Sequence, residues 1–457
     1  MFFFLQNKRY RTGHERVDQL SCFFTDIRDR FDLFAVAAHQ RERLVFRAVL
    51  HIAQILLRLP GIHACTYAEY RVGRDRDHTV IPQYLCSCIN IRFLKHFHTS
   101  TFPVYDIIHN EVMITMIRFD SDYIEGCIPE ILEALAKTNS EQTVGYGEDP
   151  HCEHARELIR KAIGKEDADV HFLVGGTQAN TTVIASVLRP HQGALCAETG
   201  HIACHETGAL EAAGHKCLTL PTEDGTITAE QVEAAIQAHY SDESFEHIVQ
   251  PGLVYISYPT ESGTLYSRTQ LKALYETCQK YDIPLFIDGA RLGYGLCSRY
   301  SDLTMQDIAS FSDIFYIGGT KVGALFGEAV VITNPKYKKD FRYHIKQRGG
   351  MLAKGRMLGI QFEELFTDDR YMKISRHAIA MAEKLTDGLR AKGVEFRYEA
   401  VTNQIFPVLS NAKIQELRDA GFSFHTWGAV DEDRTAVRFV TSFMTPEENI
   451  EALLARF

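Results

Sequence analysis

Short apolar runs rich in β-branched residues alternate with amphipathic helical segments from residue 116 to about residue 340. Runs such as 253–257 (Leu-Val-Tyr-Ile-Ser) and 284–288 (Pro-Leu-Phe-Ile-Asp) are apolar on both faces of a strand. Strands of this kind fit a parallel sheet whose two faces are both covered by helices. We expect further strands at 170–174, 195–197, 313–317 and 328–333, and helices at 130–137, 178–188, 203–213, 229–238 and 268–281. The pattern predicts a large α/β domain over residues 116–345.

The pattern changes after about residue 340. A basic, glycine-containing stretch leads into expected helices at 357–366 and 371–392. Strands at 394–398, 404–408 and 435–441 and a helix at 412–420 follow. These segments predict a smaller α+β domain over residues 346–457.

The first part of the chain has a different composition. Residues 1–112 hold 15 Lys and Arg against 11 Asp and Glu, and the whole chain holds 49 against 59, so the remainder has 34 against 48. Only three of the 31 glycines lie in the first part. It shows neither helical nor strand periodicity beyond one helical stretch at 39–59.

Three interpretations of this extension, residues 1–115, compete. It is a basic accessory domain for membrane or nucleic acid, a targeting segment, or upstream sequence translated ahead of a true start at Met113 or Met116. Acidic residues are too frequent for a transit peptide, which argues against the second interpretation. We expect the third, because local signals become consistent from Met116 onward.

Overall composition excludes several classes of protein. The chain is 45% hydrophobic with a formal net charge of −10, which argues against disorder and against a nucleic-acid-binding protein. No uninterrupted apolar stretch is long enough to span a membrane. Eleven cysteines in 457 residues are too sparse for a disulfide scaffold, so we expect a cytoplasmic protein without nucleic-acid or membrane partners. His151 and His154 indicate a solvated helix face, and we predict no metal site.

A glycine-containing loop connects an expected strand to an expected helix at 174–180 (Val-Gly-Gly-Thr-Gln-Ala-Asn). The free N–H groups of a helix start favour an anion, and Thr177 adds a hydroxyl donor. No Gly-Lys-Ser/Thr follows, so the loop is not a nucleotide-binding P-loop. It suits a single phosphate, although Gly-Gly turns are common.

Two further segments place charged residues at expected strand ends. Asp288 ends a buried strand in Phe-Ile-Asp-Gly-Ala-Arg, with Arg291 three residues later. Lys321 lies among glycines and apolar residues in Gly-Gly-Thr-Lys-Val-Gly, where desolvation would lower its pKa and favour an amine nucleophile. A phosphate loop, a carboxylate and such a lysine, in this order, predict a pyridoxal 5′-phosphate site.

Additional strings narrow the expected reaction. Arg-Phe-Asp-Ser-Asp-Tyr at 118–123, Tyr-Gly-Glu-Asp-Pro at 146–150, Glu-Thr-Gly-His at 198–201 and Val-Arg-Phe-Val-Thr-Ser at 437–442 occur together with Asp-Gly-Ala-Arg and Gly-Gly-Thr-Lys. In this order they resemble the threonine aldolase family, in the β-eliminating lyase group of fold-type-I pyridoxal-phosphate enzymes. The resemblance covers residues 116–457 and none of residues 1–112.

The resemblance implies a role for each matching residue. Lys321 would form the Schiff base, Asp288 would hold the pyridine nitrogen, and His201 would stack on the cofactor ring near the substrate hydroxyl. Three residues would bind the cofactor phosphate: Gly176, Thr177 and Gln178. Three would hold the substrate carboxylate, and a fourth would line the site: Ser121, Arg291, Arg438 and Tyr146. The family also implies a homodimer or homotetramer.

One departure from the family pattern concerns the catalytic base. Members often carry a second active-site histidine in an Asn-Thr-His segment, where this chain has Ser257-Tyr-Pro-Thr-Glu-Ser-Gly263 with Pro259 at the matching position. We expect a low-specificity L-threonine/L-allo-threonine aldolase that releases glycine and acetaldehyde. His201, a water molecule or the cofactor phosphate stays open as the base. Another pyridoxal-phosphate lyase or aminotransferase acting on a β-substituted amino acid is the alternative, and a non-catalytic protein on this fold is a third.

Overall fold

The computed structural model describes residues 116–457, which belong to one compact unit. The predictions for residues 1–115 lie outside the described residues. Within residues 116–457 no helix is both long and apolar enough to cross a membrane.

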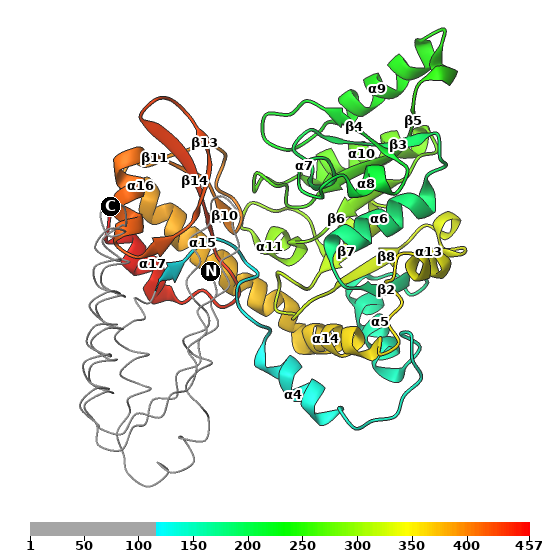
Figure 1. Ribbon diagram of the computed structural model, residues 1–457, viewed down its shortest axis with the longest axis horizontal. Coiled ribbons are helices and arrows are strands. Elements are labelled where there is room, and N and C mark those ends of the chain that lie inside the picture. Colours follow the sequence, from blue (N-terminus) through cyan, green and yellow to red (C-terminus); the bar gives the residue numbers. More distant parts are fainter. Residues whose placement is uncertain (1–115) are drawn as a thin grey trace, which may run out of the picture. The chain divides into compact units, whose positions relative to one another are not determined.

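A seven-stranded sheet forms the centre of the larger part (Figure 1). Its strands lie in the order β2-β8-β7-β6-β5-β3-β4. All neighbours pair in parallel except β8, which runs antiparallel to β2 and β7. The mostly parallel sheet is therefore confirmed. The strands are β2 (Asp169–Leu173), β3 (Gln192–Ala197), β4 (Lys216–Leu220), β5 (Gln250–Ser257), β6 (Leu285–Asp288), β7 (Ile314–Gly318) and β8 (Glu328–Ile332).

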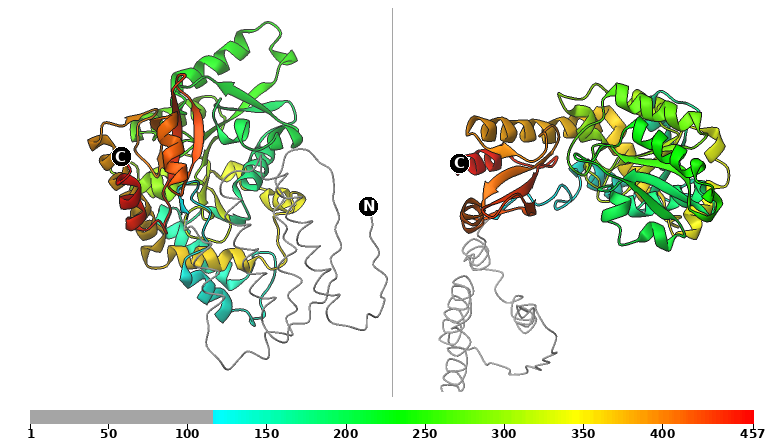
Figure 2. Two further views of the ribbon diagram at one scale, coloured as in Figure 1. Left: turned by 60° about the vertical axis from the view of Figure 1, so that its left-hand side comes forward. Right: turned by 90° about the horizontal axis from the view of Figure 1, so that it is seen from above.

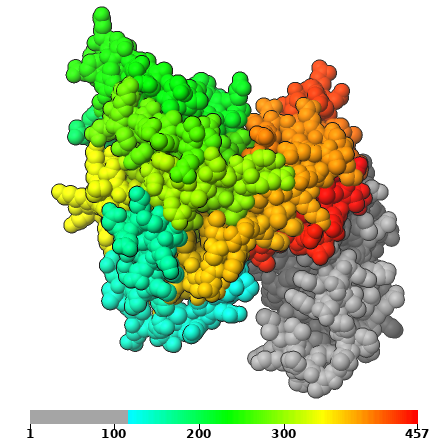
Figure 3. All heavy atoms as spheres, turned by 180° about the vertical axis from the view of Figure 1, so that it is seen from behind, coloured from blue at the N-terminus to red at the C-terminus, as the bar shows by residue number. Residues whose placement is uncertain are grey.

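Helices cover both faces of this sheet, because successive residues of each buried strand point to opposite sides. Val254 and Ile256 of β5 join one apolar core, and Leu253 and Tyr255 join the other. The helices are α4 (Pro129–Lys137), α5 (Pro150–Ile163), α6 (Gly176–Val187), α7 (His201–Cys204), α8 (Ala209–Ala212), α9 (Ala229–Ser241), α10 (Arg268–Lys280), α11 (Leu292–Cys297), α12 (Met305–Ser310), α13 (Phe341–Gln347) and α14 (Arg356–Phe366). The segment of α9 projects at one end of this part (Figures 1 and 3).

A second, smaller sheet lies beside the large one in Figure 2. Antiparallel pairing joins β9 (Glu395–Phe396), β10 (Gln404–Ile405), β11 (Pro407–Ser410), β13 (His425–Ala429) and β14 (Arg434–Val440). The helices α16 (Asn411–Asp419) and α17 (Glu447–Leu454) complete this part, and β1 (Ile117–Arg118) pairs in parallel with β12 (Phe422–Ser423). The start of the described chain therefore returns to its C-terminal part.

One long helix, α15 (Arg370–Ala391), packs against a core of the large sheet and against the core of the small sheet. Its first half contributes Ala378 and Ile379 to a core of the large sheet, and its second half contributes Leu385 and Leu389 to the core of the small sheet. Helix α14 contacts α5 and α4, which belong to the large part. The boundary at 345/346 stays a prediction, while the packing places α14 with the large sheet.

One expected helix, at 203–213, is wrong in the structure. The segment forms two short helices, α7 and α8, instead. Thr207 and Gly208 between them have φ of 53° and 70°, in the left-handed region that a continuing α-helix cannot include. This break leaves His201 at the start of its own short helix. The strand β4 was not among the expected strands, whereas α5 contains His151 and His154, for which a helix was expected.

Candidate active site

The carboxyl ends of the parallel strands meet at one edge of the large sheet, where α/β proteins bind ligands. Asp288 is the last residue of β6, and Lys321 follows β7 by three residues. The 174–178 loop follows β2, and His201 follows β3. Because β8 runs the other way, its first residue, Glu328, lies at the same edge, paired with Leu173 and Gly318.

Asp288 lies in a closed hydrogen-bond network. Its Oδ2 accepts from Tyr255 Oη (2.6 Å) and Asn180 Nδ2 (3.1 Å), and its Oδ1 accepts from Ala290 N (3.0 Å) and from Tyr316 Oη. Burial raises the pKa of Asp288, but the charge of His201 and the two tyrosine hydroxyls outweigh burial and hold the pKa below its usual value. The carboxylate therefore stays ionised although it is 4% exposed.

The network contains three residues that sequence reasoning missed: Asn180, Tyr255 and Tyr316. Both tyrosines lie inside apolar strand runs and resemble ordinary core residues. The pairing register of β5 and β6 is the signal that could have identified Tyr255. Tyr255 pairs with Phe286, two residues before Asp288, so the two side chains lie on the same face of the sheet. Asn180 also donates to Glu206 Oε1 (2.7 Å), which links the network to the next part of the site.

Lys321 lies in the turn after β7, where its backbone is fixed by a hydrogen bond from Tyr294 Oη to Lys321 O (2.6 Å). Burial lowers the pKa of Lys321, and the neighbouring Arg291 lowers it further, against the opposing charges of Asp122, Asp288 and Glu328. A lysine amine with a lowered pKa is a better nucleophile near neutral pH. The structure thus gives Lys321 the environment that its sequence context predicts.

Glu328 is a further buried acid beside Lys321 that the sequence analysis missed. Its Oε1 accepts from Thr320 Oγ1 (3.1 Å), and its Oε2 is buried without a partner. Burial raises the pKa of Glu328 to about 8, although the charge of Lys321 opposes this shift. At neutral pH the raised pKa favours the protonated carboxyl group of Glu328 beside Lys321.

The loop after β2 opens into helix α6, whose N-cap is Gly175 without a side-chain cap. The first N–H groups of such a helix have no intrahelical acceptor and can bind an anion. A Cβ at Gly176 would lie 3.0 Å from Tyr316 Oη, so a larger residue there would press on the tyrosine that donates to Asp288. The side chain of Gln178 is already engaged, with Oε1 accepting from Val174 N (3.1 Å) and Nε2 donating to Arg348 O (3.0 Å). Its backbone N–H, at the start of α6, is left for the predicted phosphate.

His201 lies against two acids that sequence reasoning missed. Its Nδ1 is hydrogen-bonded to Glu206 Oε1 (2.8 Å), and its backbone N–H donates to Glu261 Oε1 (2.9 Å). Burial lowers the pKa of His201, but the Glu206 hydrogen bond and the charge of Asp288 raise it above the usual value overall. Burial raises the pKa of Glu261, whose Oε1 also accepts from Ser257 Oγ (2.6 Å). Glu261 lies two residues after Pro259, where the family pattern changes.

Two buried polar atoms without partners mark the other end of the site. Ser121 Oγ and Arg438 Nε have no hydrogen-bond partner among the described residues. Arg438 donates through Nη1 to Gln404 Oε1 (3.4 Å) and through Nη2 to Asp120 O (3.2 Å). Unpaired buried polar groups are costly, and a ligand that supplies the missing acceptor removes the cost.

Arg291 is held by an acid from the start of the described chain. It donates through Nε to Asp122 Oδ2 (2.6 Å) and through Nη2 to Asp122 Oδ1 (3.0 Å), and Asn403 Nδ2 also donates to Oδ2 (2.9 Å). Burial alone would lower the pKa of Arg291, but Asp122 raises it, so both charges persist. This pair keeps two of the nitrogens of Arg291 from a substrate, which the sequence did not predict.

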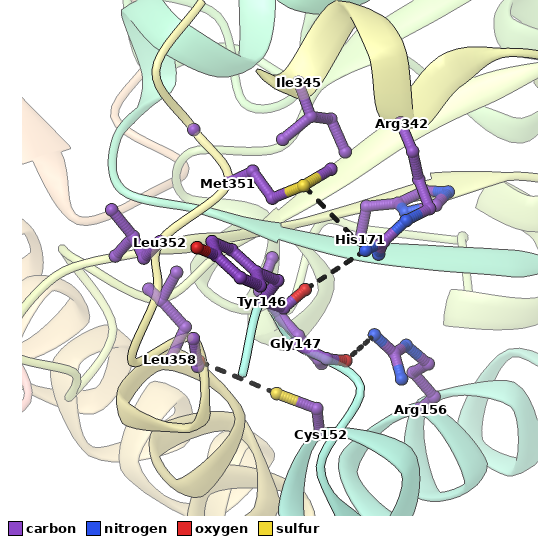
Figure 4. Close-up of a pocket in the computed structure, with 13 residues that line it drawn as sticks. Tyr146, Gly147, Cys152, Arg156, His171, Arg342, Ile345, Met351, Leu352 and Leu358 are labelled. Carbon is purple, nitrogen blue, oxygen red and sulfur yellow. Dashed lines mark hydrogen bonds between the residues drawn. The ribbon is translucent and has the colours of Figure 1, made fainter. Parts of the chain in front are cut away.

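No hydrogen bond in the described residues joins Tyr146 to Lys321 or Asp288, and the same holds for Ser121, Thr177 and Gln178. It has a φ of 61°, its carbonyl accepts from Arg342 Nη2 (3.3 Å), and it lines a cavity of about 30 Å³ (Figure 4). A cavity of this size holds about one water molecule, too little for a cofactor. The place of Tyr146 at the substrate stays a prediction.

The remaining arrangement fits pyridoxal phosphate. It combines an amine nucleophile, an ionised carboxylate at the bottom of the site, a helix start free to bind a phosphate, and unpaired donors that suit a carboxylate. In addition, Arg291 and Asp122 both act electrostatically on Lys321, and Arg291 acts on Arg438, so the two ends share one set of charges.

Comparison with known proteins agrees with this chemistry. The sequence model of the family described as "Beta-eliminating lyase" matches residues 119–412. The low specificity L-threonine aldolase of a Pseudomonas sp. is 30% identical over 345 residues, covering 74% of this chain and 96% of that protein. The same enzyme of Pseudomonas aeruginosa is 30% identical over 339 residues, covering 74% and 95%.

Solved structures give the same result. A Leishmania major threonine aldolase superposes with a TM-score of 0.72 at 41% identity, covering 74% of this chain and 97% of that one. An aspartate aminotransferase of Thermus thermophilus, at 15% identity and a TM-score of 0.56, shares the fold alone. The chain therefore belongs to the β-eliminating lyase family, among the threonine aldolases, and is a pyridoxal-phosphate-dependent lyase of fold type I.

Proposed function

We propose that this chain cleaves L-threonine and L-allo-threonine to glycine and acetaldehyde by a retro-aldol reaction. The observation that carries the proposal is the pair of unpaired buried donors, Ser121 Oγ and Arg438 Nε, in a site that also holds Lys321. An α-amino acid whose amine replaces that of Lys321 on the cofactor would present its carboxylate to these donors. The names of two similar proteins, both threonine aldolases, support threonine as a substrate.

Asp288 and Lys321 prepare the site for the cofactor. When bound, pyridoxal phosphate supplies an electron sink for the electron pair of the breaking Cα–Cβ bond. Lys321 would hold the cofactor covalently through its amine, and the ionised Asp288 would keep the ring nitrogen protonated. A carboxylate has about four acceptor positions, and Asp288 uses all of them. We infer that Asn180, the longest of the four contacts, gives way, because it keeps a partner in Glu206.

The phosphate and the ring are held by separate elements. The N-terminal N–H groups of α6, at Gly176, Thr177 and Gln178, bind the phosphate, and the hydroxyl of Thr177 adds a donor. His201 stacks on the ring, oriented by Glu206 through Nδ1. Its raised pKa favours the charged imidazolium at neutral pH.

The substrate carboxylate is anchored by Ser121 and Arg438, with the remaining nitrogen of Arg291 beside them. Two anchor points fix the rotation about the bond from the amine to Cα. The Cα–Cβ bond can then lie perpendicular to the cofactor plane, where its electrons leave most easily. Asp122 holds Arg291 in place for this task.

The test uses the full chain loaded with pyridoxal phosphate. Acetaldehyde is followed with a coupled reductase after adding L-threonine or L-allo-threonine. We expect aldehyde release without ammonia or a keto acid, and complete loss of release and of covalent cofactor attachment in Lys321→Ala. Lys280→Ala, at an exposed lysine paired with Glu233, is the matched control. Ammonia or a keto acid from a β-substituted amino acid would instead establish another lyase or an aminotransferase.

We also propose that the enzyme is a cytoplasmic homodimer or homotetramer. Several large apolar side chains are exposed in the described part, among them Leu132, Val144 and Tyr343, which is 77% exposed. Apolar side chains of this size are usual at subunit contacts. Light scattering coupled to size exclusion would give the mass; a monomeric mass would contradict the proposal.

A further inference from the structure

The residue that takes the proton from the substrate β-hydroxyl has not been identified in this chain. Pro259 stands where related sequences often have a histidine, and proline has no group that can accept a proton. A base must lie on the substrate side of the site, must be unprotonated at the working pH, and must have a free lone pair. These three conditions can be applied to each candidate near Lys321.

The nearest candidates fail at least one condition. The Nδ1 of His201 is used by Glu206, and the raised pKa of His201 favours the form that donates a proton. Glu206 Oε2 has no partner, but the Glu206 side chain is fully buried and its Oε1 is shared between His201 and Asn180, so it does not reach the substrate side. Glu261 Oε1 already accepts from Ser257 Oγ and from the His201 backbone, and burial raises its pKa.

His205 remains, one helical turn after His201. It is the C-cap of α7, its backbone N–H donates to His201 O (2.9 Å), and its side chain is exposed. The two imidazole rings lie side by side, with centroids 5.7 Å apart and planes inclined by 51°. Residues four apart on a helical turn share one face, so His205 faces the same side of the site as His201.

The charges around His205 place it on the substrate side. Arg438 of β14, which we assign to the substrate carboxylate, and Lys321 of the loop after β7, which holds the amine end, both act electrostatically on it. His201 of α7 is the third charged neighbour. A side chain on which both of these groups act lies on the side of the site toward which a substituent on Cα extends.

We propose that His205 is the general base for the β-hydroxyl, an assignment that rests on the proposed function. The hydroxyl proton passes to an imidazole nitrogen of His205, and the O–H electron pair becomes the second bond of the aldehyde carbonyl. The Cα–Cβ pair passes to the bound cofactor, and the glycine carbon is reprotonated, so one proton moves from oxygen to carbon overall. Because His205 is exposed, its proton exchanges with water before the next turnover.

The protonation state of His205 supports this role. Partial desolvation lowers its pKa, and the positive charges of His201, Arg438 and Lys321 lower it further. A histidine with a pKa below its usual value is neutral at pH 7 and accepts a proton. Activity that needs this base rises as the pH passes upward through that lowered pKa.

The experiment separates removal of the hydroxyl proton from every other step. His205→Phe keeps a planar ring without a base, and His205→Gln keeps a polar side chain. His247→Phe, at an exposed histidine of η3 (Phe245–His247), is the matched control. Two rates are measured on each cofactor-loaded full chain: acetaldehyde release from L-allo-threonine, and exchange of the glycine α-hydrogen in D₂O by NMR, which needs no β-hydroxyl base.

We expect His205→Phe to lower kcat for acetaldehyde release by about 10²–10⁴-fold and to leave glycine exchange within about threefold. The acid limb of kcat/KM, present in the unaltered enzyme below the usual histidine pKa, should disappear. The melting temperature of the cofactor-free protein should not change. Retained aldehyde release, an unchanged acid limb, or equal loss of both rates would overturn the assignment. Glycine exchange without aldehyde from either threonine diastereomer in the unaltered enzyme would overturn the proposed function itself.

Discussion

The two ends of the site differ in how their buried polar groups are hydrogen-bonded. We call the end around Asp288, which faces the cofactor nitrogen, the nitrogen end, and the end around Ser121 and Arg438, which faces the substrate carboxylate, the carboxylate end. At the nitrogen end, Asp288 accepts four hydrogen bonds from within the protein. At the carboxylate end, Ser121 Oγ and Arg438 Nε are buried with no partner. A buried charge with a full set of donors is held rigidly in its protonation state, whereas unpaired donors store a cost that only a ligand removes. The comparison predicts that damage at the nitrogen end changes the chemistry and damage at the carboxylate end changes substrate binding.

Asp288→Asn should have the largest effect of the four changes. An amide cannot keep a pyridine nitrogen protonated, and it turns one acceptor of the Asp288 network into a donor facing tyrosine hydroxyls. We expect kcat for acetaldehyde release to fall by about 10²–10⁴-fold, with a smaller change in KM. Asp313→Asn, at a buried aspartate that accepts from Gln279 and Leu285 away from the site, is the control for lost stability alone. A variant that changes only KM would contradict the assigned role.

Arg438→Met should chiefly raise KM. It removes the charged donor that we assign to the substrate carboxylate, a loss of about 2–5 kcal/mol when the partner charge is buried. By the relation between energy and affinity, this corresponds to roughly 30-fold or more in KM. Arg434→Met, on the same strand but exposed and paired with Asp431, is the matched control. If KM for L-allo-threonine stays unchanged while kcat falls, the carboxylate is held elsewhere.

Tyr316→Phe should weaken the nitrogen end in a pH-dependent way. Asp288 has a lowered pKa in the folded protein, so its contribution to stability is present above the unfolded pKa and is lost as the pH falls through the folded pKa. Removing the Tyr316 hydroxyl raises that pKa, and the midpoint of acid unfolding should move to higher pH. Circular dichroism across an acid titration measures it.

Tyr371→Phe is the control for this shift. Its hydroxyl donates to Gly318 O (3.0 Å) and is equally buried, but it faces no carboxylate. We expect it to cost about 1 kcal/mol of unfolding free energy without a specific acid shift. An equal acid shift in both variants would mean that Asp288 does not depend on Tyr316.

Residues of the site could be predicted from the sequence where local patterns determine their position, and not where their partners come from distant segments. Glycines, Asp288 and Lys321 stand at strand ends, and strand ends follow from local apolar periodicity, so the sheet and these positions were predictable. Tyr255 and Tyr316 were not, because a tyrosine in an apolar strand does not reveal that its hydroxyl meets a carboxylate on a neighbouring strand. The pairing of Arg291 with Asp122, 169 residues earlier, depends on the return of the chain start to the site.

The break in the expected helix at 203–213 has a local cause that periodicity does not capture. The residues keep helical spacing, but Thr207 and Gly208 adopt positive φ. The break ends α7 at Cys204, so that His205 becomes its C-cap beside His201. His205, which we propose as the base that Pro259 cannot be, could therefore not be identified before the end of α7 was known.

Ser121→Ala should have the smallest effect and gives the sharpest test of the comparison. An unpaired buried hydroxyl destabilises the ligand-free protein, so its removal should leave the melting temperature equal or higher. The same change removes one donor to the substrate carboxylate, worth about 1 kcal/mol, and should raise KM by about fivefold with kcat nearly unchanged. Thr182→Val, at another buried hydroxyl without a partner, should match the stability change and leave KM alone. A drop in melting temperature for Ser121→Ala, or an equal KM effect in both variants, would mean that the unpaired atom is not a substrate anchor. The unpaired atoms at the carboxylate end would then reflect local packing and would not indicate a binding site for the substrate carboxylate.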